Sequence, residues 1–394
     1  MASLSGRSNN LLPDNMPVLD RFTQYLFTCP RYQFLLGSGL AMLLKTGIWP
    51  IPNLGMYQQM AQHPFVNPFG DPAAHYLFWN WLGPFLAWCV GATGDIAFFL
   101  FHLLFALAFP LCLAGLAFFR LEDSLARRAM LVFVLLPVSA TAWFWVGVDA
   151  LTLCLLLLAL AFPARPFLTL LTGIALGMQH FEQGLCAAAA LVLALWLSQR
   201  QKEADLLPCR LPFALLFLGS IILGKLVLLL LFHWYGITVN AGRLYWLRSH
   251  LPELLSLFWM HSQAVLWSVL GLGWVILIGS LGRGISCRPF LITLCGLLLL
   301  LPLSWDQTRV LAVTAFPLIY VYWLARPAFL AQWTEKEMAG LTLLWLWLPW
   351  SWTWGGEPKW SVFPHDLAAL TDYLGLTAML PAPAFLWPFR SWLQ

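Results

Sequence analysis

Long apolar runs separated by short polar turns are the dominant pattern of this sequence. Each run extends over roughly 17–24 residues, the length that an α-helix needs to cross a hydrocarbon core about 30 Å thick. The pattern therefore predicts an all-α, polytopic helical membrane protein with about eleven transmembrane helices. The expected spans are residues 32–50, 96–119, 129–147, 149–164, 166–182, 184–199, 211–233, 264–281, 289–304, 309–325 and 338–354.

One further apolar segment, residues 74–92, is interrupted by tryptophan, asparagine, glycine and proline. Because tryptophan prefers the headgroup level, this segment is expected to form interfacial helices instead of crossing the membrane. That choice places about fourteen Lys and Arg residues on the cytoplasmic side and about five outside, as the positive-inside rule favours. A crossing at 74–92 would reverse the bias.

The spans divide the chain into three predicted parts. Residues 1–31 form a cytoplasmic N-terminal segment, residues 32–354 form the transmembrane domain, and residues 355–394 form an outer-side C-terminal segment. Two long outer loops, 51–95 and 234–263, interrupt the domain. The first thirty residues are polar and lack the apolar core of a signal peptide, so the first span is expected to remain as an anchor in the inner (plasma) membrane.

The composition agrees with this class of protein. Of 394 residues, 61% are hydrophobic and 10% are charged, whereas soluble domains average about 25% charged residues. The net charge of +4 fits cytoplasmic basic loops and requires no nucleic-acid partner. The eight cysteines have no CxxC spacing and are interpreted as small apolar residues, not as disulfides or metal ligands.

Three short outer turns carry the candidate chemistry. Asp149 lies in WVGVDALT, His180 and Glu182 lie in GMQHFEQG, and Asp306 and Arg309 lie in SWDQTR. In the predicted topology all three turns open to the same side, like the rim of a polar cavity. The alternative is that each turn is merely polar, with Asp149 capping the helix that follows it.

Three cations outside these turns are candidate ligands for a lipid phosphate. Lys225 lies inside a predicted span, and an intramembrane charge is a functional hypothesis by default. Its expected partner is Glu182 or Asp149. Arg243 and Arg248 lie in the second outer loop, where cations at headgroup level can bind phosphate. For all three, the alternative is an ordinary snorkelling side chain.

The order of these parts resembles the GT-C superfamily of polyprenyl-phosphate-sugar-dependent glycosyltransferases. IPNLGMYQQMAQ, HYLFWNWLGPFLAWCVG and the span ending at Arg120 are similar to the family's first outer loop, its aromatic surface segment and its second span. LLPVSATAWFWVGVDALTLCLLLLAL and LTGIALGMQHFEQGLCAAAALVLAL resemble the spans and the Gly-rich hairpin that follow. The resemblance covers roughly residues 32–200.

The resemblance implies transfer of a sugar from a polyprenyl-phosphate donor to a glycan, lipid or protein acceptor on the outer face. Arginines would neutralise the phosphate, and an outer acid would serve as general base or hold a divalent metal. The family's first-loop acid is replaced by Asn53, four residues before Tyr57. An amide cannot act as a base, so either Asp71 or Asp149 takes this role or the chain does not catalyse the reaction.

Three other functions fit the same pattern. A polymerase or ligase of surface polysaccharide would use the outer arginines for a lipid pyrophosphate. A lipid or solute transporter would show broken helices in paired half-spans, and the sequence shows no internal repeat that would favour one. An assembly subunit would use the Trp-rich C-terminal segment for docking.

Overall fold

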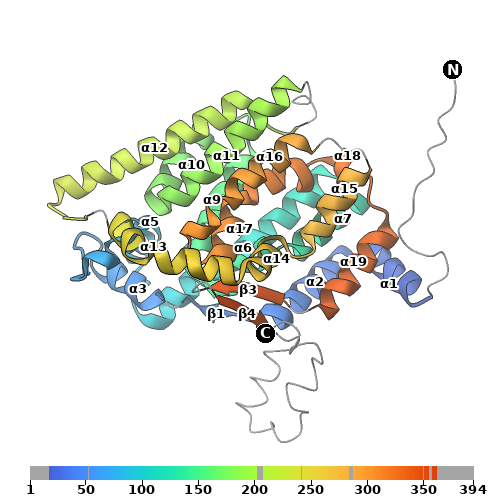
Figure 1. Ribbon diagram of the computed structural model, residues 1–394, viewed down its shortest axis with the longest axis horizontal. Helices are drawn as coiled ribbons and strands as arrows, with labels where there is room; N and C mark the ends of the chain where they lie inside the picture. The colour runs from blue at the N-terminus through green and yellow to red at the C-terminus, as the bar shows by residue number, and fades with distance from the viewer. Residues whose placement is uncertain are drawn as a thin grey trace, which may run out of the picture.

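The computed structural model describes residues 17–51, 53–201, 207–240, 242–283, 287–348, 350–354 and 357–361. Over these residues the chain is almost entirely helical, so the all-α class is correct (Figure 1). The predicted C-terminal segment lies largely outside the described residues, as does the start of the N-terminal segment.

The first outer loop is built from short helices, as the sequence predicts. The elements up to its end are α1 (Pro17–Thr28), α2 (Arg31–Thr46), α3 (Leu54–Gln62), η1 (Pro72–Ala74), α4 (His75–Phe78) and α5 (Leu82–Cys89). The central part of the chain contains α6 (Asp95–Arg120), α7 (Asp123–Leu135), α8 (Pro137–Thr141), α9 (Val148–Ala161), α10 (Pro166–Gln179), α11 (Phe181–Arg200) and α12 (Leu211–Trp234).

The last part of the described chain adds further helices and short strands. The helices are α13 (Gly242–Met260), α14 (Ser262–Leu270), α15 (Gly273–Gly282), α16 (Arg288–Leu298), η3 (Leu301–Leu303), α17 (Gln307–Ile319), η4 (Tyr320–Leu324), α18 (Pro327–Leu330) and α19 (Glu335–Trp347). Strand β1 (Trp49–Pro50) pairs in parallel with β2 (Trp145–Val146), and β3 (Trp350–Trp354) pairs in antiparallel fashion with β4 (Glu357–Ser361).

Among the described residues, three helices, α6, α11 and α12, are long and apolar enough to cross a membrane. The bent pair α14 and α15, at 77° to each other, would make a fourth. This is fewer than the eleven or so that the apolar runs predict. Helices α9 and α10 have 14 residues each and are about 21 Å long at 1.5 Å per residue, short of the hydrocarbon thickness.

Proline and local strand formation explain where the predicted spans are interrupted. The expected span 129–147 is divided at Leu136, which is extended (φ −100°, ψ 146°) because it precedes Pro137. The expected span 338–354 ends as a helix at Trp347, and β3 occupies its last residues. Apolar composition alone does not distinguish a continuous helix from these broken segments.

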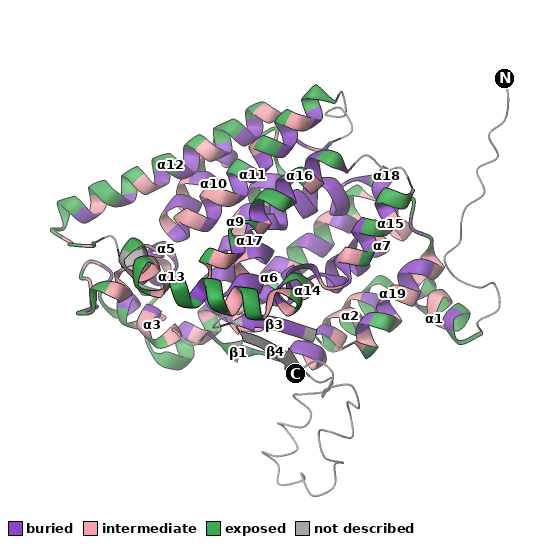
Figure 2. Cartoon of the chain, in the orientation of Figure 1, coloured by how far each residue is buried: buried purple, intermediate pink, exposed green. Residues whose placement is uncertain are grey.

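Helix α17 lies at the centre of the molecule and is buried along almost its entire length. It contacts α8, α9, α11, α14 and α16. Figure 2 shows this buried centre and the exposed residues that run along α12 and α13. The central helix therefore holds its N-terminal residues in a fixed position relative to the outer turns.

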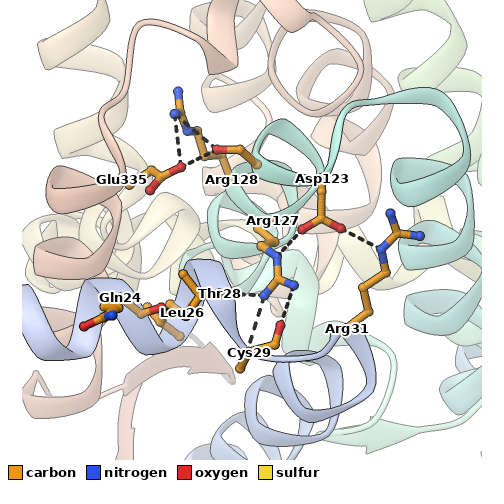
Figure 3. Close-up of polar contacts among 10 residues, drawn as sticks. Gln24, Leu26, Thr28, Cys29, Arg31, Asp123, Arg127, Arg128 and Glu335 are labelled. Atoms are coloured by element: carbon orange, nitrogen blue, oxygen red, sulfur yellow. Dashed lines mark hydrogen bonds and ion pairs between the residues drawn. The ribbon is translucent and has the colours of Figure 1, made fainter.

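Charged residues link the predicted cytoplasmic loops at one end of the bundle (Figure 3). The buried Arg127 donates to Asp123 at 2.6 Å and to the carbonyls of Leu26 and Cys29 at 2.7 and 2.6 Å. Asp123 also accepts from Arg31 at 2.6 Å. Because these carbonyls lie at the end of α1, where the helix leaves them without partners, Arg127 attaches that end of α1 to α7.

Helices α10 and α12 approach each other closely at glycine. A Cβ atom on Gly224 would overlap the carbonyl oxygen of Ile174, and one on Gly177 would overlap that of Ile221. Small residues allow this approach between apolar helices. The close contact fixes the end of α10, from which His180 follows.

We expect Gly224→Val to destabilise the protein by at least the 1–3 kcal/mol typical of overpacking, because backbone atoms must move. The measurement is thermal unfolding of the purified protein in detergent. Gly219→Val is the matched control, since a Cβ at Gly219 in the same helix meets nothing within 4 Å. Equal stability of the two variants would contradict the tight packing.

Candidate functional site

Arg309 is the centre of a polar network at the N-terminal end of α17. Its Nη1 donates to Asp149 Oδ2 at 2.8 Å, and its Nε donates to Asp306 Oδ2 at 2.7 Å. Asp306 immediately precedes the helix, and Arg309 lies in its first turn. The expected local pair of Asp306 and Arg309 is therefore present, and Asp149 joins it from another turn.

Asp149 lies in the first turn of α9 and has an exposed fraction of 0%. Gly147 occupies the N-cap position, so Asp149 does not cap this helix. Its Oδ1 lies 3.6 Å from Nδ1 of His180, the residue that joins α10 to α11. A buried carboxylate is stable only beside cationic or hydrogen-bonding groups, and Arg309 supplies one.

Burial raises the pKa of Asp306 to about 6, although the Arg309 charge acts in the opposite direction and Asp149 adds to the increase. Asp306 Oδ1 is buried and accepts no hydrogen bond from the described residues. This oxygen is the one that can take up a proton without breaking the bond to Arg309. The net charge of the network therefore changes in mildly acidic solution.

A cavity of about 260 Å³ opens beside this network. It is lined by the first outer loop, the α10–α11 turn, α13 and the turn before α17. The polar groups of its wall include Asn53, Tyr57, Asn80, His180, Glu182, Ser304, Asp306 and Arg309. Its aromatic wall consists of Tyr76, Trp246, His250 and Trp305. Two of the three predicted turns thus line one cavity, and the third contributes Asp149, which is bonded to the lining residue Arg309.

Backbone pairing positions the first outer loop at the cavity. Strands β1 and β2 pair, and the Ile51 amide donates to the Val146 carbonyl at 3.1 Å. Gly147 has no room for a side chain, because a Cβ there would meet Cγ2 of Ile51. These contacts join the start of the loop to the Asp149 turn and bring Asn53 to the cavity wall.

Two further residues of this loop form a hydrogen-bonded pair in the wall. Asn80 Nδ2 donates to the hydroxyl oxygen of Tyr57 at 2.9 Å. Burial raises the pKa of Tyr57 above its ordinary value, and the neighbouring Tyr76 adds to this effect. Tyr57 therefore remains protonated at neutral pH and can donate its hydroxyl hydrogen.

Glu182 is the carboxylate in the wall that is most available to a ligand. It lies in the first turn of α11 and is partly exposed. Among the residues that the structure describes, no hydrogen bond or ion pair occupies its oxygens. Its negative charge acts electrostatically on Lys225. Lys225 Nζ itself lies 3.3 Å from the Trp79 ring centroid.

Asp71 and Arg248 do not join the cavity wall. Asp71 is exposed, and its Oδ1 accepts from the Ala73 amide at 2.9 Å as the cap of η1. Arg248 is exposed on α13. The side chain of Arg243 lies outside the described part of the chain. The structure therefore favours Glu182 over Asp71 as an acid in contact with ligand.

The described residues do not gather a metal site. No three His, Cys, Asp or Glu side chains among them lie in an arrangement that could hold a metal ion. Both oxygens of Asp149 face Arg309 or His180. The described residues therefore do not match the divalent-metal site considered from the sequence.

Sequence reasoning missed several residues of the wall. Tyr57, Tyr76, Asn80, Trp246, His250 and Trp305 were not expected there. Asn80 is the wall residue that could most readily have been recognised from the sequence, since it is a single amide within an apolar segment. The aromatic residues offer none, because interfacial tryptophan and tyrosine are common in membrane proteins whatever their function.

Comparison of the chain with known protein families, with characterised proteins and with solved structures gives no match, so the site geometry is the basis for assigning a function.

Proposed function

We propose that this protein is an integral-membrane glycosyltransferase that transfers a sugar from a polyprenyl-phosphate donor to an acceptor hydroxyl on the outer face of the membrane. The observation that supports it is the convergence of Arg309, Glu182 and the Asn53 segment on one cavity. The resemblance of residues 32–200 to the GT-C superfamily implies a site between the same outer turns.

The cavity groups divide the reaction between them. The acceptor oxygen attacks the anomeric carbon, a new C–O bond forms, and the bond between that carbon and the phosphate oxygen breaks. Arg309 stabilises the negative charge that develops on the leaving lipid phosphate. Its Nη2 carries no bond to the described residues, whereas Nη1 and Nε are held by carboxylates.

Glu182 receives the proton of the acceptor hydroxyl. A general base must reach that proton directly or through one water molecule, and Glu182 is a partly exposed carboxylate in the wall. Asp149 acts through other residues, because it is fully buried and holds Arg309 and His180.

The membrane arrangement is part of the proposal. The long helices α6, α11 and α12 cross the inner membrane, and the shorter apolar helices together complete the crossings expected from the sequence. The N-terminus is cytoplasmic, and the donor enters from the outer leaflet beside α12, where Lys225 meets its phosphate. The donors to be tested are therefore hexoses linked to a polyprenyl phosphate.

Donor hydrolysis tests this function without knowledge of the acceptor. The purified protein in liposomes is incubated with polyprenyl-phosphate-linked hexoses, and release of free polyprenyl phosphate is measured. We expect release with at least one donor and its loss in Glu182→Gln. No release from any donor, with or without added membrane-derived acceptors, would contradict the proposal.

Binding of a lipid phosphodiester is expected to strengthen as the pH falls from 7 to 5. Above the Asp306 pKa of about 6, two carboxylates face the single charge of Arg309. Below it, Asp306 is neutral and the network has one less negative charge, which favours an anion. A dialkyl phosphate does not change its charge in this range, so any change in its affinity reflects a change in the protonation of the protein. The control, Asp306→Asn, should bind with a smaller pH dependence than the wild type.

The topology predicts that the two ends of α12 lie on opposite sides of the membrane. In a background without native cysteines, Gln201→Cys should react with a membrane-impermeant maleimide only after cell lysis. Thr238→Cys should react in intact spheroplasts, because it follows the outer end of α12. Labelling of both positions from outside would contradict the orientation.

A further inference from the structure

The cavity is lined by aromatic side chains as well as by charged ones. Trp246 and His250 of α13 stack with ring centroids 5.0 Å apart and an interplanar angle of 21°. Trp305 meets Trp246 edge-on at 5.8 Å and 70°, and meets His250 at 5.9 Å and 89°. All three rings line the cavity and are partly exposed.

The spacing along α13 explains why these rings face inward. Trp246, His250 and Leu254 are four residues apart and therefore lie on one face of the helix. Leu254 is buried, whereas Arg248 and Trp259 on other faces are exposed. His250 Nδ1 bonds to the Trp246 carbonyl at 2.9 Å, which fixes the orientation of its ring.

Aromatic rings together with amides and carboxylates in one cavity match the two-sided chemistry of a sugar ring. The face of an aromatic ring carries partial negative charge, and the C–H bonds of a pyranose carry partial positive charge because each carbon is bonded to oxygen. Hydroxyl groups at the rim of the sugar can bond to amide and carboxylate groups such as Asn53 and Glu182. The cavity volume of about 260 Å³ is just below the usual range for ligand pockets, about 300–1,000 Å³, and suits one ring.

The charge of the cavity limits which sugar can enter. Glu182 and Asp306 line it, and Asp149 lies directly behind Arg309. A uronic acid would place a further carboxylate among these groups and be repelled. A neutral sugar meets no such cost.

We propose that Trp246 and Trp305 form a stacking platform for a single neutral hexopyranose, which is the group that the enzyme transfers. This inference rests on the proposed function and specifies its substrate class. It places the apolar face of the sugar against one tryptophan and the edge of the sugar against the other, because the two ring planes are 70° apart, and it leaves the anomeric carbon to the side of Arg309 and Glu182.

Binding of methyl hexopyranosides tests the platform independently of turnover. Saturation-transfer NMR is recorded on the detergent-solubilised protein with neutral methyl hexopyranosides and with a methyl glucuronide. We expect transfer to the ring C–H protons of at least one neutral glycoside and none to the glucuronide. Trp305→Leu or Trp246→Leu should weaken Kd by about tenfold, the scale of one good aromatic contact.

The matched controls separate stacking from folding. Trp259→Leu alters an 82% exposed tryptophan on the same helix and should leave Kd unchanged. Trp305→Phe keeps a ring face and should retain most of the binding. Unchanged Kd in both leucine variants, tighter binding of the glucuronide, or no glycoside binding would overturn the platform, even if donor hydrolysis occurs. Glycoside binding without donor hydrolysis would retain the platform and reject the transferase.

Discussion

Donor turnover is expected to fall by about a hundredfold in Arg309→Lys, although the charge is kept. Removing one donor from a site that stabilises developing negative charge costs about 10²–10³ in rate. Arg309 bonds to Asp149 and Asp306 through two different nitrogens, and one ammonium group cannot reproduce this fork. The measurement is the rate of polyprenyl phosphate release under saturating donor.

The neutral double variant Asp149→Asn, Arg309→Gln separates folding from catalysis. Arg309→Met alone leaves the fully buried Asp149 without its guanidinium and should destabilise the protein by about 3–5 kcal/mol. The double variant removes the charges of Arg309 and Asp149 and should recover part of that stability, since Asp306 still loses its partner, while remaining inactive. Turnover near wild type in the double variant would show that Arg309 has only a structural role.

Glu182→Gln is expected to lower turnover by about a hundredfold or more, whereas Asp71→Asn should leave it unchanged. General base catalysis contributes about 10²–10⁴-fold, and glutamine keeps the size of the side chain while losing its basicity. Asp71 is the matched control, since it is an exposed helix cap outside the cavity. The readout is donor-dependent transfer or hydrolysis at equal protein level.

The opposite ranking of these two variants would contradict the placement of the base. A large loss in Asp71→Asn with full activity in Glu182→Gln would return the role to the first outer loop. A loss in both would contradict the assignment of the base to Glu182 alone, because asparagine keeps the cap of η1 and loses only the charge of Asp71.

The candidate site was partly predictable because ionisable residues are rare in this chain. With 10% charged residues, each charge in an outer turn is a candidate, and four of them, His180, Glu182, Asp306 and Arg309, do line one cavity. Asp71 lies outside this cavity as the cap of η1, because a position in the first loop does not show whether a carboxylate caps a helix or faces a ligand.

The sequence by itself determined the helical class, the short helices of the first outer loop and the local Asp306–Arg309 pair, because these depend on composition and on near neighbours. Only the tertiary structure decided where the helices break, which turn supplies the second partner of Arg309 and which aromatic rings face the cavity. The bond from Arg309 to Asp149 joins positions 160 residues apart. Such contacts depend on how α9, α13 and α17 pack together, and periodicity along a single segment contains no information about that packing.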